Sequence, residues 1–104
     1  MRLVQIIASS SRQRILLALS KTKQTHISNL VRMANSTYSQ VNRNLQILEN
    51  EGIVKIRHYG RVKMVELDTA NPRTRVLLQA LTILDRPLRE QELYYRSQFD
   101  RQLR

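Results

Sequence analysis

Apolar residues recur along the first third of the chain at the spacing of helices that bury one face. The spacing predicts three short helices, built around Leu3, Ile6 and Ile7, around Ile15, Leu16, Ala18 and Leu19, and around Ile27, Leu30, Val31 and Ala34. Ser10 followed by Gln13 is a capping-box signature, which predicts that the second helix begins at Ser10 and runs to about Ser20.

A fourth helix is predicted between Thr37 and Gly52. Thr37 followed by Gln40 repeats the capping box, and Gly52 lies where a helix ends in a left-handed residue. An apolar stripe should face the core, formed by Val41, Leu45 and Leu48. The opposite face is polar and free of acids before Glu49; it carries Ser39, Arg43, Gln46 and Asn50, with Gln40 and Asn42 on its flanks. Because only Asn35 and Ser36 separate it from the third helix, the two helices form a helix-turn-helix pattern.

After Gly52 the apolar period changes from 3.6 to 2, which is typical of strands. Two alternating runs flank Tyr59-Gly60 and predict a β-hairpin with a short turn. We expect the tip of this hairpin to gather four cations: Lys55, Arg57, Arg61 and Lys63.

Asn71-Pro72 predicts the start of a fifth helix, with an N-cap followed by proline at the first helical position. The segment from Val76 to Leu84 is apolar around most of its circumference, so it should be buried on two sides. We predict that a second copy of the chain covers one side, through an interface of Leu3, Ile6, Ile7, Val76, Leu77, Ala80, Leu81 and Leu84. Asp85-Arg86-Pro87 should end this helix, which divides the chain into residues 1–87 and a polar helical tail, 88–104; the tail could extend the dimer contact, pack back on the domain or fray.

Charge narrows the choice of partner. The 104 residues carry 18 Lys and Arg against 8 Asp and Glu, and the 7 basic residues before Glu49 are accompanied by no acid. Such an uneven distribution of positive charge attracts polyanions, above all nucleic acid. The simpler alternative is that the charges only keep the protein soluble. A basic helix lying on a membrane surface is disfavoured, because no basic segment carries a wide apolar face with aromatic anchors.

Several classes are disfavoured by what the sequence lacks. It has no cysteine, so disulfides and thiolate metal sites are excluded. It has no Gly-rich phosphate loop, nucleophile elbow or paired carboxylates, so we expect neither an enzyme nor a cofactor. His26 and His58 have no ligand-type neighbours and are predicted to be structural. With no membrane-spanning run and no signal peptide, we expect a cytoplasmic protein.

The order of these elements resembles the winged helix-turn-helix domains of the ArsR and MarR families, from about Ser10 to Leu67. The likeness is carried by residues 11–16 (SRQRIL), 27–31 (ISNLV), 37–48 and 57–62 (RHYGRV), and by residues 45–54 (LQILENEGIV), which resemble the family motif L..LE..G(L/I)V. It implies a mainly α fold with a small β-hairpin as the wing and a C-terminal dimerisation helix. The turn departs from the family, with Asn35 and Ser36 in place of glycine and an apolar residue; asparagine tolerates the left-handed conformation. Metal-sensing ArsR members use cysteines, so metal sensing does not carry over, and whether a small-molecule effector binds is open.

The residues and the resemblance together predict a double-stranded DNA interface. Arg43 could pair with guanine, and Gln40 or Asn42 with adenine, in the major groove. Thr37 and Ser39 are expected to contact phosphate, and Gln46 lies on the same face of the helix. The hairpin cations should contact the DNA backbone beside this helix. Arg12 and Arg14 are weaker candidates for phosphate contacts. Several of these DNA-binding candidates could instead have a purely structural role. Thr37 and Gln40 could cap the helix, Tyr38 could pack against the core, and the hairpin cations could keep an exposed strand edge in solvent.

We predict that the protein is a homodimeric transcriptional regulator, a repressor, that binds specific sequences of double-stranded DNA. Two alternatives stay open: a winged-helix module for protein interaction or assembly, and a non-specific architectural DNA-binding protein.

Overall fold

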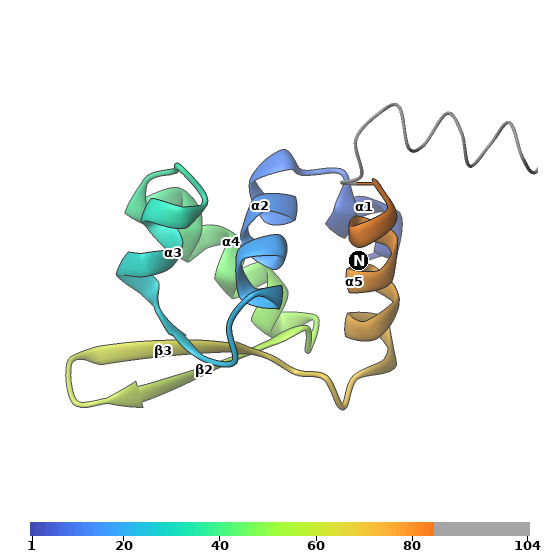
Figure 1. Cartoon of the computed structure of the whole chain (residues 1–104). Helices are drawn as coiled ribbons and strands as arrows, with labels where there is room; N and C mark the ends of the chain where they lie inside the picture. The colour runs from blue at the N-terminus through green and yellow to red at the C-terminus, as the bar shows by residue number, and fades with distance from the viewer. Residues whose placement is uncertain (85–104) are drawn as a thin grey trace, which may run out of the picture.

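The computed structural model describes residues 1–84, which form five helices and a three-stranded antiparallel sheet (Figure 1). In chain order the elements are α1 (Leu3–Ile7), α2 (Ser10–Ser20), β1 (Thr25–His26), α3 (Ile27–Met33), α4 (Tyr38–Asn50), β2 (Val54–Tyr59), β3 (Val62–Leu67) and α5 (Pro72–Leu84). The five predicted helices and the hairpin are confirmed. The predicted tail, 88–104, and the boundary at residue 87 lie outside the described residues.

The beginning of α2 differs from the prediction by one residue. Ser9, not Ser10, is the N-cap, because its hydroxyl accepts the backbone N–H of Arg12 at 3.3 Å. The side chain of Gln13 donates to the carbonyl of Ile7 in α1 instead of returning to the cap. The glutamine therefore joins α2 to α1.

The two ends of α4 are formed largely as predicted. The hydroxyl of Thr37 accepts the backbone N–H of Gln40 at 3.3 Å, and Gly52 follows the helix with φ +72°. The second half of the predicted capping box is wrong, because the Gln40 side chain accepts a hydrogen bond from the Ser36 hydroxyl, at 2.7 Å. Thr37 alone caps the helix.

The sheet contains a strand that the sequence did not indicate. β1 pairs with β3, so β3 lies in the centre of the order β1-β3-β2. β1 has only two residues, which is too short for an alternating pattern to be visible. The hairpin itself has the expected form, with Tyr59 opposite Val62 at its tip and Val54 opposite Leu67 at its base.

The helices cover one face of this sheet and leave the other open, as Figure 1 shows. The members of the core cluster come from the helices, from the covered face of the sheet and from the segments that follow α3 and α4: Ile6, Ile15, Leu16, Ala18, Leu19, Ile27, Leu30, Ala34, Val41, Leu45, Leu48, Ile53, Val54, Val65, Leu77 and Leu81. This single core fixes α4 between α2, α3 and the sheet. Among residues 1–84, no helix combines the length and hydrophobicity needed to cross a bilayer.

The start of α5 confirms the predicted cap, since Asn71 Oδ1 accepts the backbone N–H of Arg73 at 3.0 Å. One side of the helix then packs on its own chain through Leu77 and Leu81, which are buried together with Ile6 of α1. These three residues were predicted to form a dimer interface; they belong instead to the core of one chain. The prediction failed because the apolar circumference of α5 does not itself reveal which side meets α1 and α2.

Candidate nucleic-acid interface

The outer face of α4 is exposed, as the sequence predicted. Val41, Leu45 and Leu48 are fully buried, and this places Ser39, Arg43 and Gln46 in solvent on the opposite side. Asn42 is half-buried on the flank. The first turn of α4 contains no acidic residue, so its free N–H groups and the Arg43 guanidinium form a positive, polar surface.

The turn before α4 depends on Asn35, which adopts a left-handed conformation with φ 49°. The Asn35 N–H donates to the carbonyl of Arg32 at 3.2 Å, and the Ser36 N–H donates to the carbonyl of Val31 at 3.1 Å. Asparagine tolerates this conformation better than most non-glycine residues. It therefore performs the role that glycine usually has in such turns and sets the angle between α3 and α4.

Polar side chains cluster around the N-terminus of α4. Tyr38 is 52% exposed, so the alternative role of packing does not apply, and its predicted contact with DNA stays a prediction. Within residues 1–84 no hydrogen bond engages the Gln40 amide nitrogen, so its donor side faces solvent instead of the helix cap. Both side chains are available to a ligand at this end of the helix.

Arg12 joins α2 to α1 and α4 instead of facing solvent. Its Nε donates to the carbonyl of Ile6 at 3.0 Å, and its two terminal nitrogens donate to the carbonyl of Gln5 at 2.9 Å and to Asn44 Oδ1 at 3.1 Å. The guanidinium is thus occupied by α1 and α4. We remove Arg12 from the predicted DNA contacts, because reaching a phosphate would break these bonds.

Asn44 is the partner of Arg12 and was missed in the sequence. It is 8% exposed, and its Nδ2 donates to Ser11 Oγ at 3.1 Å and to the carbonyl of Gln40 at 2.9 Å. The available signal was its position: residues 41, 44, 45 and 48 follow the i, i+3, i+4, i+7 spacing of the buried stripe. A polar residue in that stripe must find buried partners, and those partners fix the position of α4 relative to α2.

The four hairpin cations do not share one tip. Lys55 lies near the base, where its Nζ is 3.8 Å from Asp68, and Arg57 Nε donates to Glu66 at 3.0 Å. Arg61 and Lys63 are nearer the turn and have no ion pair within the part of the chain that the structure describes. The predicted cluster of four is therefore wrong, and two cations at the tip are free for an anion.

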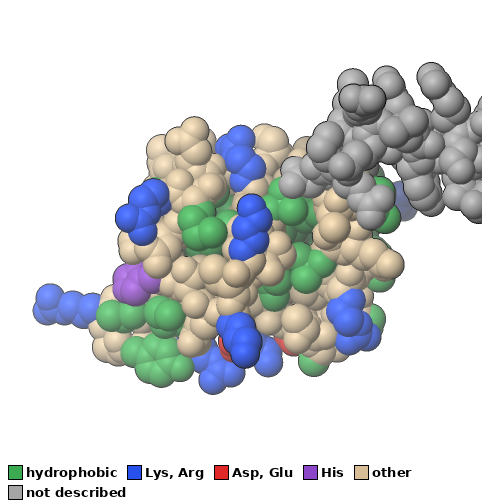
Figure 2. All heavy atoms as spheres, in the orientation of Figure 1, with side chains coloured by type: hydrophobic (Ala, Val, Ile, Leu, Met, Phe, Trp, Pro, Cys, Tyr) green, Lys and Arg blue, Asp and Glu red, His purple; other side chains and the backbone are tan. Residues whose placement is uncertain are grey.

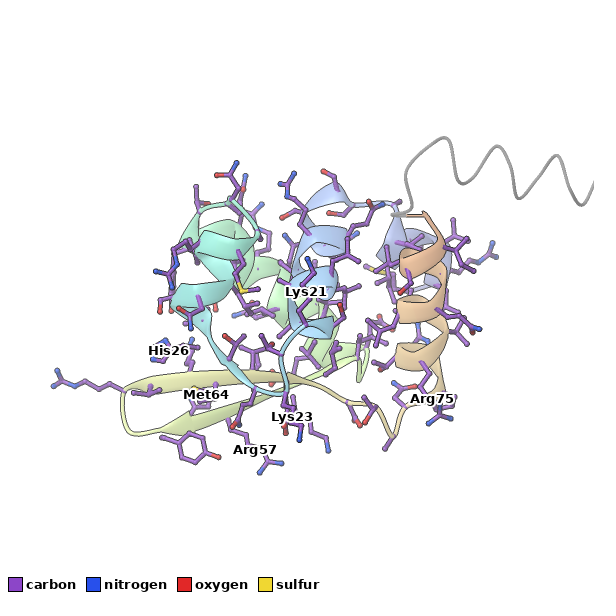
Figure 3. The ribbon with its side chains drawn as sticks, in the orientation of Figure 1. Lys21, Lys23, His26, Arg57, Met64 and Arg75 are labelled. Carbon is purple, nitrogen blue, oxygen red and sulfur yellow. The ribbon has the colours of Figure 1, made fainter. Side chains whose placement is uncertain are left out.

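Strand alternation also separates these cations by face. Arg57 lies opposite Met64 and alternates with the half-buried Ile56, so it projects from the open face of the sheet; Figure 3 shows it below the strands, away from the helices. Lys63 alternates the other way, on the same face as the buried Val65. Lys63 therefore lies on the side of the helices, and in Figure 1 the hairpin tip and the beginning of α4 lie at the same end of the molecule.

Few acidic residues balance the positive charge of this surface. Residues 1–84 hold 13 Lys and Arg but 4 Asp and Glu. Three of the four acids are in ion pairs: Glu51 with the N-terminal ammonium and Arg73, and Glu66 and Asp68 with the hairpin cations. The face shown in Figure 2 accordingly presents many basic side chains and very little acidic surface.

The two histidines form no metal cluster. His26 Nδ1 lies 3.0 Å from the Ser28 hydroxyl, and His58 is exposed on the hairpin. No group of three or more His, Cys, Asp or Glu side chains within residues 1–84 is arranged to hold a metal ion.

A second surface, on α1 and α5, is apolar and exposed. Val4 is 73% exposed and Val76 is 51% exposed; Val76, Ala80 and Ile83 follow the i, i+4, i+7 spacing of one helix face. Leu3, Ile7 and Ala80 are half-buried beside them. The sequence-based interface omitted Val4 and Ile83, which are more exposed than the core residues that it included.

Comparison with known proteins identifies the architecture. No family model matches the sequence, and no curated protein matches it. Among solved structures, the chain is similar to the antimony-specific transcriptional repressor AntR, with a TM-score of 0.68 and 20% identity over 80% of this chain and 74% of that one. It is also similar to the homodimeric winged helix-turn-helix DNA-binding domain of Mb0332 from Mycobacterium bovis, a possible ArsR-family regulator (TM-score 0.67, 18% identity, 80% and 75% covered).

A MarR-family transcriptional regulator from Silicibacter pomeroyi matches over 94% of this chain and 75% of its own, with a TM-score of 0.62 and 19% identity. The predicted fold is thus confirmed: the chain has the winged helix-turn-helix fold, with α3 and α4 as the helix pair and β2 and β3 as the wing.

Proposed function

We propose that this protein is a sequence-specific transcriptional regulator that binds double-stranded DNA as a homodimer. The observation that carries the proposal is the exposed, acid-free outer face of α4, with Arg43 and Gln46 in solvent. Most solvated helices mix Lys and Glu on such a face. Repression is the proposed mode, because AntR, which shares the fold, is a transcriptional repressor.

In this mechanism α4 enters the major groove and Arg43 donates two hydrogen bonds to a guanine edge. Gln46, Asn42 and the unpaired amide nitrogen of Gln40 offer donors to neighbouring bases, of which adenine suits an amide. Thr37, Ser39 and the Tyr38 hydroxyl lie around the helix N-terminus, where a phosphate oxygen is favoured. Base contacts then set sequence preference, and the terminal contacts set the position of α4.

The wing adds contacts with the DNA backbone. Arg61 and Lys63 have no acidic partner in residues 1–84, whereas Arg57 is bonded to Glu66 on the open face of the sheet. Arg61 and Lys63 therefore take the role that we had predicted for four residues. Arg14, which is exposed on α2, remains a weaker candidate for phosphate.

Dimerisation through α1 and α5 supports the same function. Val4 and Val76 expose apolar surface that a single chain leaves in water, and the similar domain of Mb0332 is homodimeric. Two copies of α4 related by a two-fold axis would meet half-sites about 34–36 Å apart.

Selection of bound sites from a random duplex pool tests the proposal, at a stated salt concentration. We expect a palindromic consensus with a guanine in each half-site that the Arg43→Ala variant no longer prefers, a change of about 1–3 kcal/mol in discrimination. Enrichment without a consensus would identify a non-specific architectural protein. No enrichment at all would refute DNA binding and favour the assembly module.

The salt dependence of duplex binding tests the wing. Each phosphate contact adds about 0.9 to the slope of log K against log salt, so Arg61→Gln should reduce the slope by about one unit. Arg57→Gln, an identical change on the open face, is the matched control and should reduce it less. Equal losses would contradict the proposal that Arg61, and not Arg57, contacts phosphate.

Light scattering at micromolar concentration tests the dimer. Val76→Asp should give a monomer, because a carboxylate would be buried in an apolar interface. Gln79→Asp adds the same charge at an exposed position on α5 and should leave the dimer intact. A monomeric wild-type chain would overturn this part of the proposal.

A further inference from the structure

A surface cavity of about 230 Å³, open to solvent, lies between α2 and α3 and is lined by Arg14, Leu17, Ala18, Lys21 and Met33. Its size is informative. A cavity of about 150 Å³ holds benzene, whereas drug-sized ligands take about 300–1,000 Å³. The space suits a small molecule somewhat larger than a single aromatic ring.

The floor of the cavity is one stripe of α2. Residues 14, 17, 18 and 21 follow the i, i+3, i+4, i+7 spacing, so they lie on a single helix face. The stripe reads cation, apolar, apolar, cation, and its two ends are roughly 10.5 Å apart along the axis. Lys21 is the C-cap that follows α2, and Figure 3 shows it at that end of the helix.

The two cations have no acidic partner. Arg14 and Lys21 take part in none of the ion pairs or side-chain hydrogen bonds within residues 1–84, in contrast to Arg12 on the same helix. No acid lines the cavity. Two like charges facing one space favour an anion there.

The remaining wall is adaptable. Met33 is 46% exposed, and its unbranched thioether can adjust to the shape of a ligand. Together with Leu17 and Ala18 it offers an apolar surface to the body of a molecule whose charged group is held by the cations.

We propose that this cavity binds a small amphipathic anion, a carboxylate attached to an apolar body of roughly eight carbon atoms, since about 150 Å³ accommodates the six of benzene. The carboxylate is held by Arg14 or Lys21, and the body lies against Leu17, Ala18 and Met33. A purely polar anion would leave the apolar side chains in contact with water, and a purely apolar molecule would give the two cations no anionic partner.

Binding there also has a route to α4, which rests on the proposed function. Met33 is the last residue of α3, two positions before the left-handed Asn35. A ligand packed against Met33 would hold this side chain in one position at the end of α3, next to the turn that sets the direction of α4. The anion would therefore change duplex affinity without touching DNA.

Calorimetric titration of the full chain with octanoate, in the absence of DNA, tests the site. We expect binding by octanoate and none by acetate or octylammonium over the same concentration range. Arg14→Gln and Lys21→Gln should each weaken binding about five-fold, which corresponds to about 1 kcal/mol. Met33→Glu, which places a negative charge on the exposed wall, should abolish it.

The matched control is Lys23→Gln, which removes the same charge from an exposed position that does not line the cavity. It should leave octanoate affinity within two-fold of the wild type. Equal weakening by Lys23→Gln and Lys21→Gln, equal binding of octylammonium, or no binding of octanoate would each overturn the proposal. Thermal melts of the variants exclude unfolding as the cause of any loss.

Because this titration contains no DNA, its failure is distinguishable from failure of the proposed function. If octanoate binds, adding it should shift the duplex affinity of the wild type and leave that of Met33→Glu unchanged. An unchanged wild-type affinity would overturn the route through α3 alone.

Discussion

Asn44 couples α4 to the rest of the domain, and replacing it by alanine should be costly. The substitution removes three side-chain hydrogen bonds: from Arg12 to Oδ1, and from Nδ2 to Ser11 and to the Gln40 carbonyl. Neutral bonds contribute about 0.5–1.5 kcal/mol each and a bond to a charged group about 1.5–3 kcal/mol. Since Arg12 is half-buried and water can reach it, we expect a loss of about 2–3 kcal/mol, or roughly 8–24 °C in melting temperature for a domain of this size.

Thermal and urea unfolding of Asn44→Ala would measure this loss, with Asn50→Ala as the control. Asn50 is exposed at the end of the same helix and should cost less than about 0.5 kcal/mol. In a double-mutant cycle with Arg12→Ala, the two losses should overlap by about 1 kcal/mol, because each removes the bond between them. Strict additivity, or an Asn44→Ala variant as stable as the control, would refute the role given to this pair.

Substitutions at three further positions probe the ends of α4. The pKa of Glu51 is lowered by hydrogen bonds from the N-terminal ammonium and then from Arg73, so its contribution is present above the ordinary glutamate pKa of about 4.3 and is lost as pH falls through the lowered value. Chemical unfolding should therefore find Glu51→Gln less stable than the wild type at neutral pH, and the difference should shrink as the pH falls below the ordinary glutamate pKa and through the lowered one. Gly52→Ala should lose about 1 kcal/mol or more, because φ is +72° and the new Cβ would lie 3.1 Å from Asn71 Nδ2; a neutral result would contradict the strain. Asn35→Gly should be neutral or stabilising and Asn35→Val destabilising by about 1–2 kcal/mol in the same assay, and the reverse order would show that the left-handed turn is not required.

The sequence predicted those parts of the fold that local physics decides. Helix positions, the Thr37 cap and the left-handed Asn35 and Gly52 all follow from spacing, capping chemistry and backbone sterics within a few residues. The outer face of α4 was predicted for the same reason, since a helix with one buried stripe has only one direction left for its polar side chains.

The rest depended on contacts between segments far apart in the chain. Arg12 and Arg14 are alike in sequence, yet Arg12 meets Asn44, 32 positions away, and Arg14 remains in solvent. The division of the hairpin cations likewise follows from the register that places Arg57 opposite Met64. The buried side of α5 could not be predicted either, because apolar residues cover most of the helix circumference between Val76 and Leu84.

The pairing of β1 with β3 links two parts of the molecule that would otherwise hinge separately. His26, in the strand, is followed at once by Ile27 of α3, with no linker between them. Because of this connection, the wing cannot rotate about its base unless the first turn of α3 moves with it. In the proposed complex, a duplex that contacts both the wing and α3 meets a frame of fixed geometry. The DNA would then have to bend, which favours sequences that bend readily even at base pairs that the protein does not contact.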